Sequence, residues 1–397
     1  MITSIKGGEA AIAASHRLLA KRRRGNPAIA DLGVDQIREQ LSLAVDRVMS
    51  EGSLYDPDLA ALAIKQSEGD LTEAIYLLRA FRTTLTRFGY AEPVDPAAMV
   101  VRRRIATTHK DVPGGQLLGP TYDYTHRILD IALLRASSDD LTDLAGDGES
   151  SYEKGAEDDA AEPGSDSAAH ALTKDCGVLA LADIVEDARP DGQSEVADIT
   201  RDPVEFPSTR DQRLQSLARG DEGFLMGLCY STMRGYGRNH PFVAELRCGD
   251  VAVVLTIPEL NIAVGIGSIC LTECQTVHLT TSDGALPPRY TRGYGLVFGH
   301  SERKALSMAI LDRSLRSAEL GETATYPGQD DEFVLSHCDS VAASGLVQHL
   351  KLPHYVDFQA EMQLLGQMCA DYAERHANPS LKRTPGPDTM TEALSGD

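Results

Sequence analysis

Apolar side chains recur every three or four residues between about residues 35 and 89, a spacing that predicts amphipathic helices. Carboxylates mark the expected helix starts and glycines the ends: Asp35, Asp56 before Pro57 and Asp70, then Gly52, Gly69 and Gly89. The links are short, so neighbouring helices are expected to pack antiparallel in a small bundle. A further helix is expected over Tyr124–Leu134, after a turn-rich connector. The pattern therefore predicts a helical domain over residues 1–135.

Between residues 243 and 299 the pattern changes to short apolar runs separated by turn residues, which is typical of β-structure. We expect strands at Val243–Cys248 and Val251–Ile257, joined as a hairpin by Gly249-Asp250. A third strand is expected at Leu260–Leu271, and a Gly-rich strand or loop at Arg292–Gly299. The fold class predicted is α+β: an N-terminal helical bundle followed by a largely antiparallel β-sheet domain with packed helices.

The formal net charge is -21, and it is unevenly distributed along the chain. Residues 137–167 hold 11 acidic residues and one basic residue, Lys154, and contribute -10 of that charge. Such a segment has too little apolar surface to form a core, so residues 136–170 are predicted to be a disordered linker or insertion. The α+β domain is then expected over residues 171–376, followed by a disordered polar tail over 377–397.

Composition narrows the class of protein. A strongly acidic chain repels nucleic acid, so phosphates are expected to bind only at local basic sites. The seven cysteines are odd in number and widely spaced, which is typical of reduced thiols in a cytoplasmic protein. No apolar run of about 18 residues occurs, so no membrane span is expected. Cys270 and Cys274 lack a third partner, because position 277 is Val277, and the radical iron–sulfur motif is therefore absent.

The tetrapeptide Arg-Gly-Tyr-Gly occurs twice and gives two candidate phosphate sites. In the first, Arg234, Tyr236 and Arg238 surround a flexible turn, where two forked guanidinium groups suit a phosphate. A solvated surface turn is an equally good interpretation. The second begins at Arg292 and Tyr294 and leads into a helix capped by Ser301 and running to about Arg316, with Arg303 and Lys304 in its first turn. A helix N-terminus attracts anions, although tight strand–helix packing also requires small residues.

Two segments carry groups suited to proton transfer or to stabilising a cationic sugar centre. Asp123 and His126 follow a Gly- and Pro-rich turn, although a simple connector into the helix Tyr124–Leu134 is the better interpretation from sequence. Asp221 and Glu222 are paired carboxylates, yet they equally suit the cap of the helix Phe224–Met233, which is the better interpretation from sequence.

His349 and His354 form a candidate metal site. Pro353 disfavours a helix between them, so they do not share a simple helical face. Asp357 or Glu361 is a candidate third ligand or supporting group. Isolated histidine pairs are more often not ligands, and a two-residue site needs ligands from elsewhere.

Taken together, several ordered blocks resemble the PhnI family, subunit I of the carbon–phosphorus lyase core complex. The resemblance leaves out the acidic segment and the tail. The blocks are Lys6–Glu9, Leu43–Met49, Arg79–Leu85, Lys110–Arg127, Arg234–Phe242, Thr291–Lys304 and His349–Glu361.

The resemblance implies a transferase. Family members act with subunits G, H and L to replace the adenine of ATP by methylphosphonate, and subunit I alone is implied to be a purine nucleosidase acting on ATP or GTP. A separate J subunit performs the radical cleavage. Two copies each of G, H, I and J are implied to assemble around subunit I, which makes a dimer of this chain. The pair matching His349 and His354 is implied to hold zinc at the interface with J.

We therefore hypothesise a mechanism in which four cationic side chains hold the triphosphate, with Mg²⁺ bridging its oxygens. These side chains are Arg234, Arg238, Arg292 and Lys304. Asp123, Asp221 and Glu222 are candidates for the carboxylate that stabilises the sugar when the purine leaves. Two other classes of function stay open: a non-catalytic scaffold, and a metal-dependent phosphohydrolase that leaves the base attached.

Overall fold

The computed structural model describes residues 7–112, 114–134, 196–236, 240–257, 259–280 and 287–377. The predicted acidic linker lies outside these residues, as does the predicted tail after Ala377. The chain forms two compact units: Arg17–Ala343, and the two chain ends, Met1–His16 with Ser344–Asp397. Each unit is described by itself.

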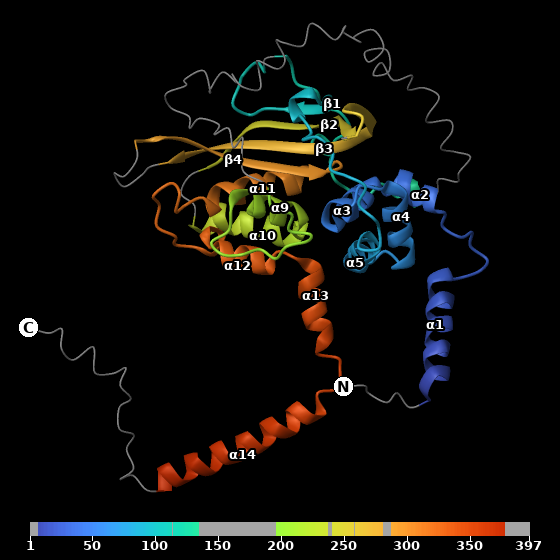
Figure 1. Cartoon of the computed structure of the whole chain (residues 1–397), viewed down its shortest axis with the longest axis vertical. Helices are drawn as coiled ribbons and strands as arrows, with labels where there is room; N and C mark the ends of the chain where they lie inside the picture. Colours follow the sequence, from blue (N-terminus) through green and yellow to red (C-terminus); the bar gives the residue numbers. More distant parts are fainter. Residues whose placement is uncertain are drawn as a thin grey trace, which may run out of the picture. The chain divides into compact units, whose positions relative to one another are not determined.

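The larger unit is built on an antiparallel sheet in which the strands lie in the order β1-β2-β3-β4 (Figure 1). The strands are β1 (Val100–Ile105), β2 (Phe242–Ile257), β3 (Ile262–Thr280) and β4 (Arg289–Phe298). The predicted α+β class and the antiparallel pairing are confirmed. Cys270 and Cys274 both lie in β3 as free thiols.

The predicted hairpin at Gly249-Asp250 is wrong, because β2 continues through both residues. Gly249 pairs with Val101 of β1, and a Cβ atom at Gly249 would overlap the carbonyl oxygen of Val100. The glycine therefore permits close strand pairing and does not form a turn. The chain reverses later, between β2 and β3, where Asn261 has a φ of 49°.

Helices lie on one side of the sheet: α9 (Arg210–Arg219), α10 (Glu222–Ser231), α11 (Glu302–Leu315) and α12 (Asp331–His337) (Figure 1). Helix α11 packs directly on β4. Cβ atoms at Gly293 and Gly295 would overlap the carbonyl oxygens of Ala309 and Ala305, so both glycines are required by this close approach. The second Arg-Gly-Tyr-Gly thus belongs to a strand, and the helix predicted after Ser301 is confirmed.

Four N-terminal helices share a second core: α2 (Val34–Gln40), α3 (Ser42–Gly52), α4 (Pro57–Gln66) and α5 (Leu71–Arg82). Asp56 accepts a hydrogen bond from Leu59 N at 2.9 Å, and Asp70 accepts one from Thr72 N at 3.0 Å, so both predicted caps are confirmed. Asp35 is not a cap, because α2 begins one residue earlier, after Gly33. The buried core residues are Ile37, Val45, Val48, Met49, Ala60, Ala61, Ala63, Ile64, Ala74, Ile75 and Leu78.

The first 135 residues also contribute to the sheet, since β1 lies within the range predicted to be helical. The predicted helix over Tyr124–Leu134 is reduced to a single 3-10 turn at Ile131–Leu134. Gly and Pro residues before this segment favour turns, and most of its side chains are exposed, so no core contact stabilises a longer helix.

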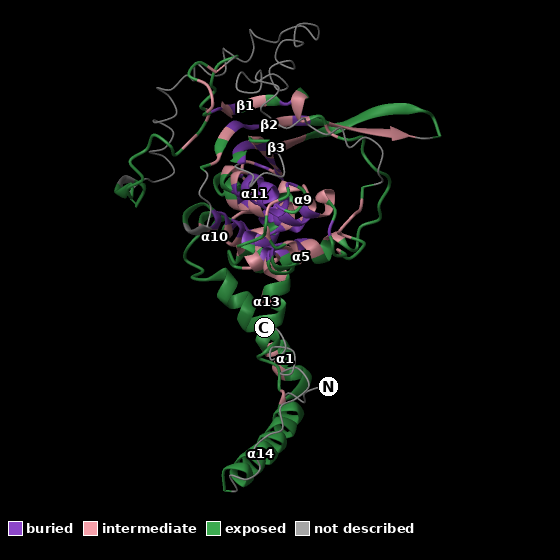
Figure 2. Cartoon of the chain, turned by 90° about the vertical axis from the view of Figure 1, so that its left-hand side faces the viewer, coloured by how far each residue is buried: buried purple, intermediate pink, exposed green. Residues whose placement is uncertain are grey.

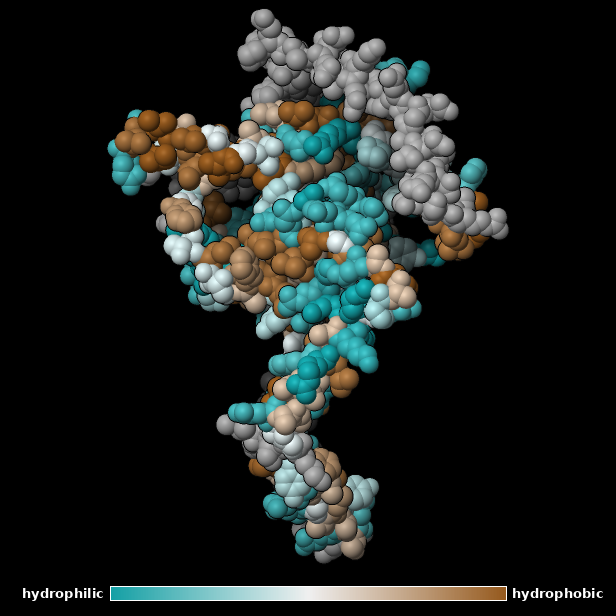
Figure 3. Space-filling view, turned by 90° about the vertical axis from the view of Figure 1, so that its right-hand side faces the viewer, coloured by the Kyte–Doolittle hydropathy of each residue, from teal (hydrophilic) through white to brown (hydrophobic). Residues whose placement is uncertain are grey.

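The joined ends of β2 and β3 extend beyond the shorter neighbouring strands and form an exposed arm (Figure 2). The arm carries exposed apolar side chains, namely Leu260, Ile262, Val264 and Ile266. Figure 3 shows the hydrophobic surface gathered on this projecting arm. Exposed apolar surface of this kind marks a site of contact with another molecule.

The smaller unit contains the long helix α14 (Tyr355–Ala377), which has no buried residue. Helices α1 (Gly8–Arg24) and α13 (Ser340–His349) cross the boundary between the two units. Within the described residues, no helix has the length and apolar character needed to cross a membrane.

Candidate functional site

A buried network of charges surrounds the first turn of α11. The side chain of Lys304 is fully buried, and its Nζ lies 3.6 Å from Oε1 of Glu51. The same Oε1 accepts hydrogen bonds from Arg47 Nε and from the backbone N of Glu222, both at 3.0 Å. Burial lowers the pKa of Lys304 to about 8, while Glu51 acts in the opposite direction. Lys304 therefore faces a carboxylate of its own chain, away from solvent.

Asp221 and Glu222 both belong to this network. Asp221 accepts a hydrogen bond from Phe224 N at 2.7 Å and pairs with Arg47 at 2.7 Å, so the predicted helix cap is confirmed. Glu222 accepts a hydrogen bond from Ser301 Oγ at 3.3 Å, and its other oxygen lies 2.9 Å from the guanidinium of Arg303. The side chain of Arg303 is 73% exposed, so this ion pair opens to solvent.

The anion site predicted at the β4–α11 junction is occupied by groups of the chain itself. The backbone N of His300 donates to Asp46 at 2.9 Å, and that of Ser301 donates to Thr272 Oγ1 at 3.0 Å. Burial raises the pKa of Asp46. The hydrogen bond to Glu302 raises the pKa of His300. The helix dipole thus stabilises an internal carboxylate at this position.

Asp123 reaches the same end of α11 through Arg103. The Arg103 side chain is 2% exposed; it pairs with Asp123 at 2.5 Å and also with Glu302. These contacts with Arg103 lower the pKa of Asp123. Asp123, Asp221, Glu222 and Lys304 are therefore brought to one end of α11 from distant parts of the sequence, whereas His126 is exposed.

Arg292 and Tyr294 lie elsewhere, on β4. Tyr294 Oη lies 3.1 Å from Glu273, and Glu273 also binds Arg247. Burial raises the pKa of Tyr294. The carbonyl of Arg292 accepts a hydrogen bond from Arg316 Nη1 at 2.9 Å. This second polar cluster is built across β2, β3 and β4.

The first Arg-Gly-Tyr-Gly is only partly described. Arg234 is exposed in a π-helical turn, with its guanidinium 5.8 Å from the ring of Tyr230. Arg238 lies outside the described residues, and the side chain of Tyr236 is not described. The same tetrapeptide therefore occurs in two different backbone conformations.

His349 and His354 lie together in the smaller unit, with their Nε2 atoms 2.9 Å apart. Nδ1 of His354 contacts the carbonyl of Leu352, which leaves Nε2 as the ring nitrogen facing the neighbouring imidazole. Across the described residues, no group of three or more His, Cys, Asp or Glu side chains is arranged to hold a metal. The pair supplies two imidazole nitrogens, which is fewer ligands than a complete tetrahedral metal site requires.

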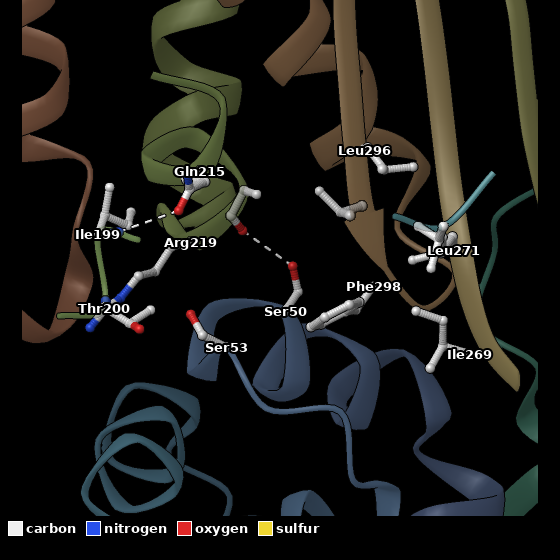
Figure 4. Close-up of a pocket in the computed structure, with 13 residues that line it drawn as sticks. Ser50, Ser53, Ile199, Thr200, Gln215, Arg219, Ile269, Leu271, Leu296 and Phe298 are labelled. Carbon is white, nitrogen blue, oxygen red and sulfur yellow. Dashed lines mark hydrogen bonds between the residues drawn. The ribbon is translucent and has the colours of Figure 1, made fainter. Parts of the chain in front are cut away.

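A cavity of about 270 Å³ lies where α3, α9 and the edge of the sheet meet (Figure 4). Apolar side chains of β3 and β4 form one wall, and polar side chains of α9 and residues 199–200 form the opposite wall. The lining residues are Ser50, Ser53, Val94, Ile199, Thr200, Gln215, Ala218, Arg219, Ile269, Leu271, Leu296, Val297 and Phe298. No pattern in the sequence indicates this cavity, because its walls come from six separate segments.

Arginines gather behind the polar wall. Arg219 Nε is buried and has no hydrogen-bond partner in the described part of the chain; Asp339 lies 4.0 Å away. Burial, and then the nearby charge of Arg79, lower the pKa of Arg219. Arg82 donates to Thr200 Oγ1 at 2.9 Å, and burial lowers its pKa as well. This wall therefore carries positive charge that its own carboxylates do not fully balance.

Comparison with known proteins identifies the family. The chain matches the family described as "Bacterial phosphonate metabolism protein (PhnI)" over residues 1–372. It is 52% identical over 401 residues to "Alpha-D-ribose 1-methylphosphonate 5-triphosphate synthase subunit PhnI" of Rhizobium meliloti (strain 1021), covering 99% of this chain and 100% of that protein. The protein of the same name from Escherichia coli (strain K12) is 51% identical over 370 residues, covering 93% and 98% of the two chains. The chain therefore belongs to the PhnI family, and the predicted resemblance is confirmed.

Proposed function

We propose that this chain is a subunit of the carbon–phosphorus lyase system, and that with subunits G, H and L it transfers the ribose 5-triphosphate of ATP to methylphosphonate, releasing adenine. Alone, it hydrolyses the N-glycosidic bond of ATP or GTP. The observation that carries the proposal is the identity of 52% and 51% to two proteins whose printed names are those of synthase subunits for the methylphosphonate product. The reaction takes place in the cytoplasm.

Departure of the purine leaves positive charge on the anomeric carbon of the ribose, which a carboxylate stabilises. Asp221 is engaged as a helix cap and Asp123 is held by Arg103. Glu222 differs, because its partner Arg303 is largely exposed, and an ion pair with such an exposed partner contributes little free energy that a ligand must overcome. Glu222 is therefore the preferred carboxylate for this step.

Cations hold the triphosphate in this proposal. Arg234 and Arg292 supply guanidinium groups, and Mg²⁺ supplies charge neutralisation when it is bound to the phosphates. In this proposal Tyr236 and Arg238 also belong to the phosphate-binding motif. Lys304 stays beneath Glu51 and acts through that carboxylate, because its ammonium is fully buried.

The histidine pair serves a different role in the proposal. His349 and His354 present two imidazole nitrogens 2.9 Å apart, a donor set that suits Zn²⁺ once other ligands are added. Those ligands come from subunit J. The exposed apolar side chains of α14, including Tyr355, Phe358 and Met362, supply surface for partner subunits, and this chain forms a dimer within the complex.

The test is to incubate the purified chain with ATP and with GTP and to measure free adenine and guanine by chromatography. The expected result is release of base, with Glu222→Gln reducing the rate at least a hundredfold and Asp123→Asn changing it less. Subunits G, H and L with methylphosphonate are then added to the same assay. Failure to release base in both assays contradicts the proposal and favours the scaffold, while phosphate released with the base still attached favours a phosphohydrolase.

A further inference from the structure

We propose that the cavity between α3, α9 and the sheet edge holds the base and ribose of the nucleoside triphosphate, and that the arginines behind its polar wall hold the phosphates. This inference rests on the proposed function and names the part of the molecule where its substrate binds. It places the phosphates at Arg82 and Arg219, and so replaces Arg234 and Arg292, neither of which lines the cavity, as the phosphate-binding residues.

The size and walls of the cavity suit a flat ring. Its volume of about 270 Å³ is near the lower end of the range for ligand pockets, about 300–1,000 Å³, so it suits a ligand of nucleoside size. Leu271, Leu296 and Phe298 present apolar surface on one side (Figure 4). A purine buries its two apolar faces against such a wall, and its polar edge remains available for the opposite wall.

Most polar groups of the opposite wall are already used within the protein. Gln215 donates to the carbonyl of Ala197 at 2.6 Å and accepts from Ile199 N at 3.3 Å. Ser50 Oγ donates to the carbonyl of Ala218 at 3.2 Å. Arg219 differs, since its Nε–H is buried with no acceptor in the described part of the chain. A buried donor of this kind is satisfied when a ligand brings an acceptor.

The positive charge at this wall favours an anionic ligand. Five arginines are coupled here, whereas the carboxylates that interact with them are Asp198 and Asp339. The arginines are Arg79, Arg82, Arg87, Arg201 and Arg219. The whole chain has a net charge of -21, so this local excess of positive charge is opposite in sign to the charge of the chain as a whole. A polyphosphate is the ligand group that guanidinium forks bind best.

The cavity also adjoins the residues of the proposed chemistry. Ser50 directly precedes Glu51, and Arg219 lies two residues before Asp221. Arg79 connects the two regions, because it donates to the carbonyls of Glu51 at 2.8 Å and of Arg219 at 3.3 Å. A ligand in the cavity therefore contacts the same α3 and α9–α10 segments that carry the buried network.

The experiment is a calorimetric titration of the full-length chain with ATP and, separately, with inorganic tripolyphosphate, both with Mg²⁺. Ala218→Trp fills the cavity from α9, and Ile199→Trp fills it from a different segment of the same wall, so the result does not depend on one variant folding. Both are expected to weaken ATP binding at least tenfold and to leave tripolyphosphate binding within twofold. Arg219→Met and Arg82→Met are expected to weaken both ligands at least fivefold. The matched control is Ala28→Trp, at an exposed alanine outside the cavity, which is expected to change neither.

Unchanged ATP affinity in folded Ala218→Trp and Ile199→Trp overturns the assignment of the cavity, whatever the chain catalyses. Absence of ATP binding to the wild-type chain overturns it as well. Cavity-dependent ATP binding without release of base, alone or with subunits G, H and L, leaves the cavity as a nucleotide site and contradicts the proposed function. The two failures are therefore distinguishable.

Discussion

Two neighbouring regions of the larger unit differ in how far their cations are balanced by carboxylates. Around the first turn of α11, cations and carboxylates from α3, α10 and α11 bind each other, and Lys304 is sealed beneath Glu51. Behind the cavity, Arg219 retains a buried Nε–H with no partner within the described residues, and five arginines interact with two carboxylates. Lys304 Nζ and Glu51 Oε2 likewise make no hydrogen bond within the described residues, but their charges are opposite and 3.6 Å separates Nζ from Oε1. The second region has more cations than carboxylates, which is the basis of the anion site proposed there.

Because the two regions differ in this way, a cluster of basic residues in a sequence is a weak guide to an anion site. The Gly-rich turn before α11 has the expected strand–turn–helix form, yet Asp46 already accepts from its backbone. Charges that satisfy each other stabilise a fold or position a neighbouring group, whereas unbalanced charge costs stability and favours ligand binding. Measured stability should therefore separate the two regions.

The largest effect is expected for Lys304→Met. This substitution leaves Glu51 buried without its lysine, and breaking a buried ion pair in this way costs about 3–5 kcal/mol. Urea denaturation measures the free energy of unfolding. The double variant Lys304→Met with Glu51→Gln is expected to recover most of the loss, and a loss below about 1 kcal/mol in the single variant contradicts the closed network.

The second expected effect is a pH dependence of the free energy of unfolding, caused by Lys304 in the same ion pair. The pKa of Lys304 is lowered from 10.5 to about 8 in the folded chain, so the unfolded chain binds more protons between these values. The free energy of unfolding of the wild type should therefore rise with pH across this window, by up to about 3 kcal/mol relative to Lys304→Met. Parallel curves for the two proteins between pH 8 and 10.5 would show that folding does not lower the pKa of Lys304.

A smaller effect is expected for Asp221→Ala. Loss of a helix cap costs about 1 kcal/mol, and the half-buried Arg47 loses one of its two carboxylate partners. Asp221→Asn keeps a capping oxygen and is the matched control. Thermal unfolding of both variants should give the larger shift for alanine, and equal shifts would assign the loss to the ion pair with Arg47.

The smallest effect on stability is expected for Arg219→Met. Burial and the charge of Arg79 both disfavour the guanidinium, so its removal should leave the free energy of unfolding unchanged within about 1 kcal/mol, or raise it. ATP affinity should fall in the same variant. A loss of stability comparable to that of Lys304→Met would place Arg219 in a closed network as well and would remove the contrast.

The sequence predicted much of the local structure, because its causes are local. Asp56, Asp70 and Asp221 were identifiable as caps from position and residue type, and each accepts the expected backbone hydrogen bond. Gly249 was misinterpreted as a turn residue. A glycine is needed there because β1 pairs closely with β2 at this position, and β1 is far away in the sequence. The candidate carboxylates and Lys304 were predicted as separate sites, and their convergence at α11 depends on tertiary packing.

The cavity could not be predicted from the sequence either, because it too depends on tertiary packing. Its two walls combine Ser50, Thr200, Arg219, Leu271 and Phe298, and no local spacing relates these positions. One signal was present, since Arg79–Leu85 was among the blocks that resemble the family and contains Arg79 and Arg82. The block alone does not indicate what these arginines do, because the residues with which they interact lie in α9 and in residues 198–201.

The pairing of β1 with β2 has a consequence for folding speed. β2, β3 and β4 join through neighbouring segments, whereas β1 pairs across the whole stretch from Ile105 to Phe242. Contacts between distant residues slow folding, so β1 is expected to dock after the three-stranded sheet has formed. Loop-closure entropy grows only slowly with length, by about 0.6 kcal/mol for each doubling, so relatives are free to lengthen or shorten this connection at little cost in stability.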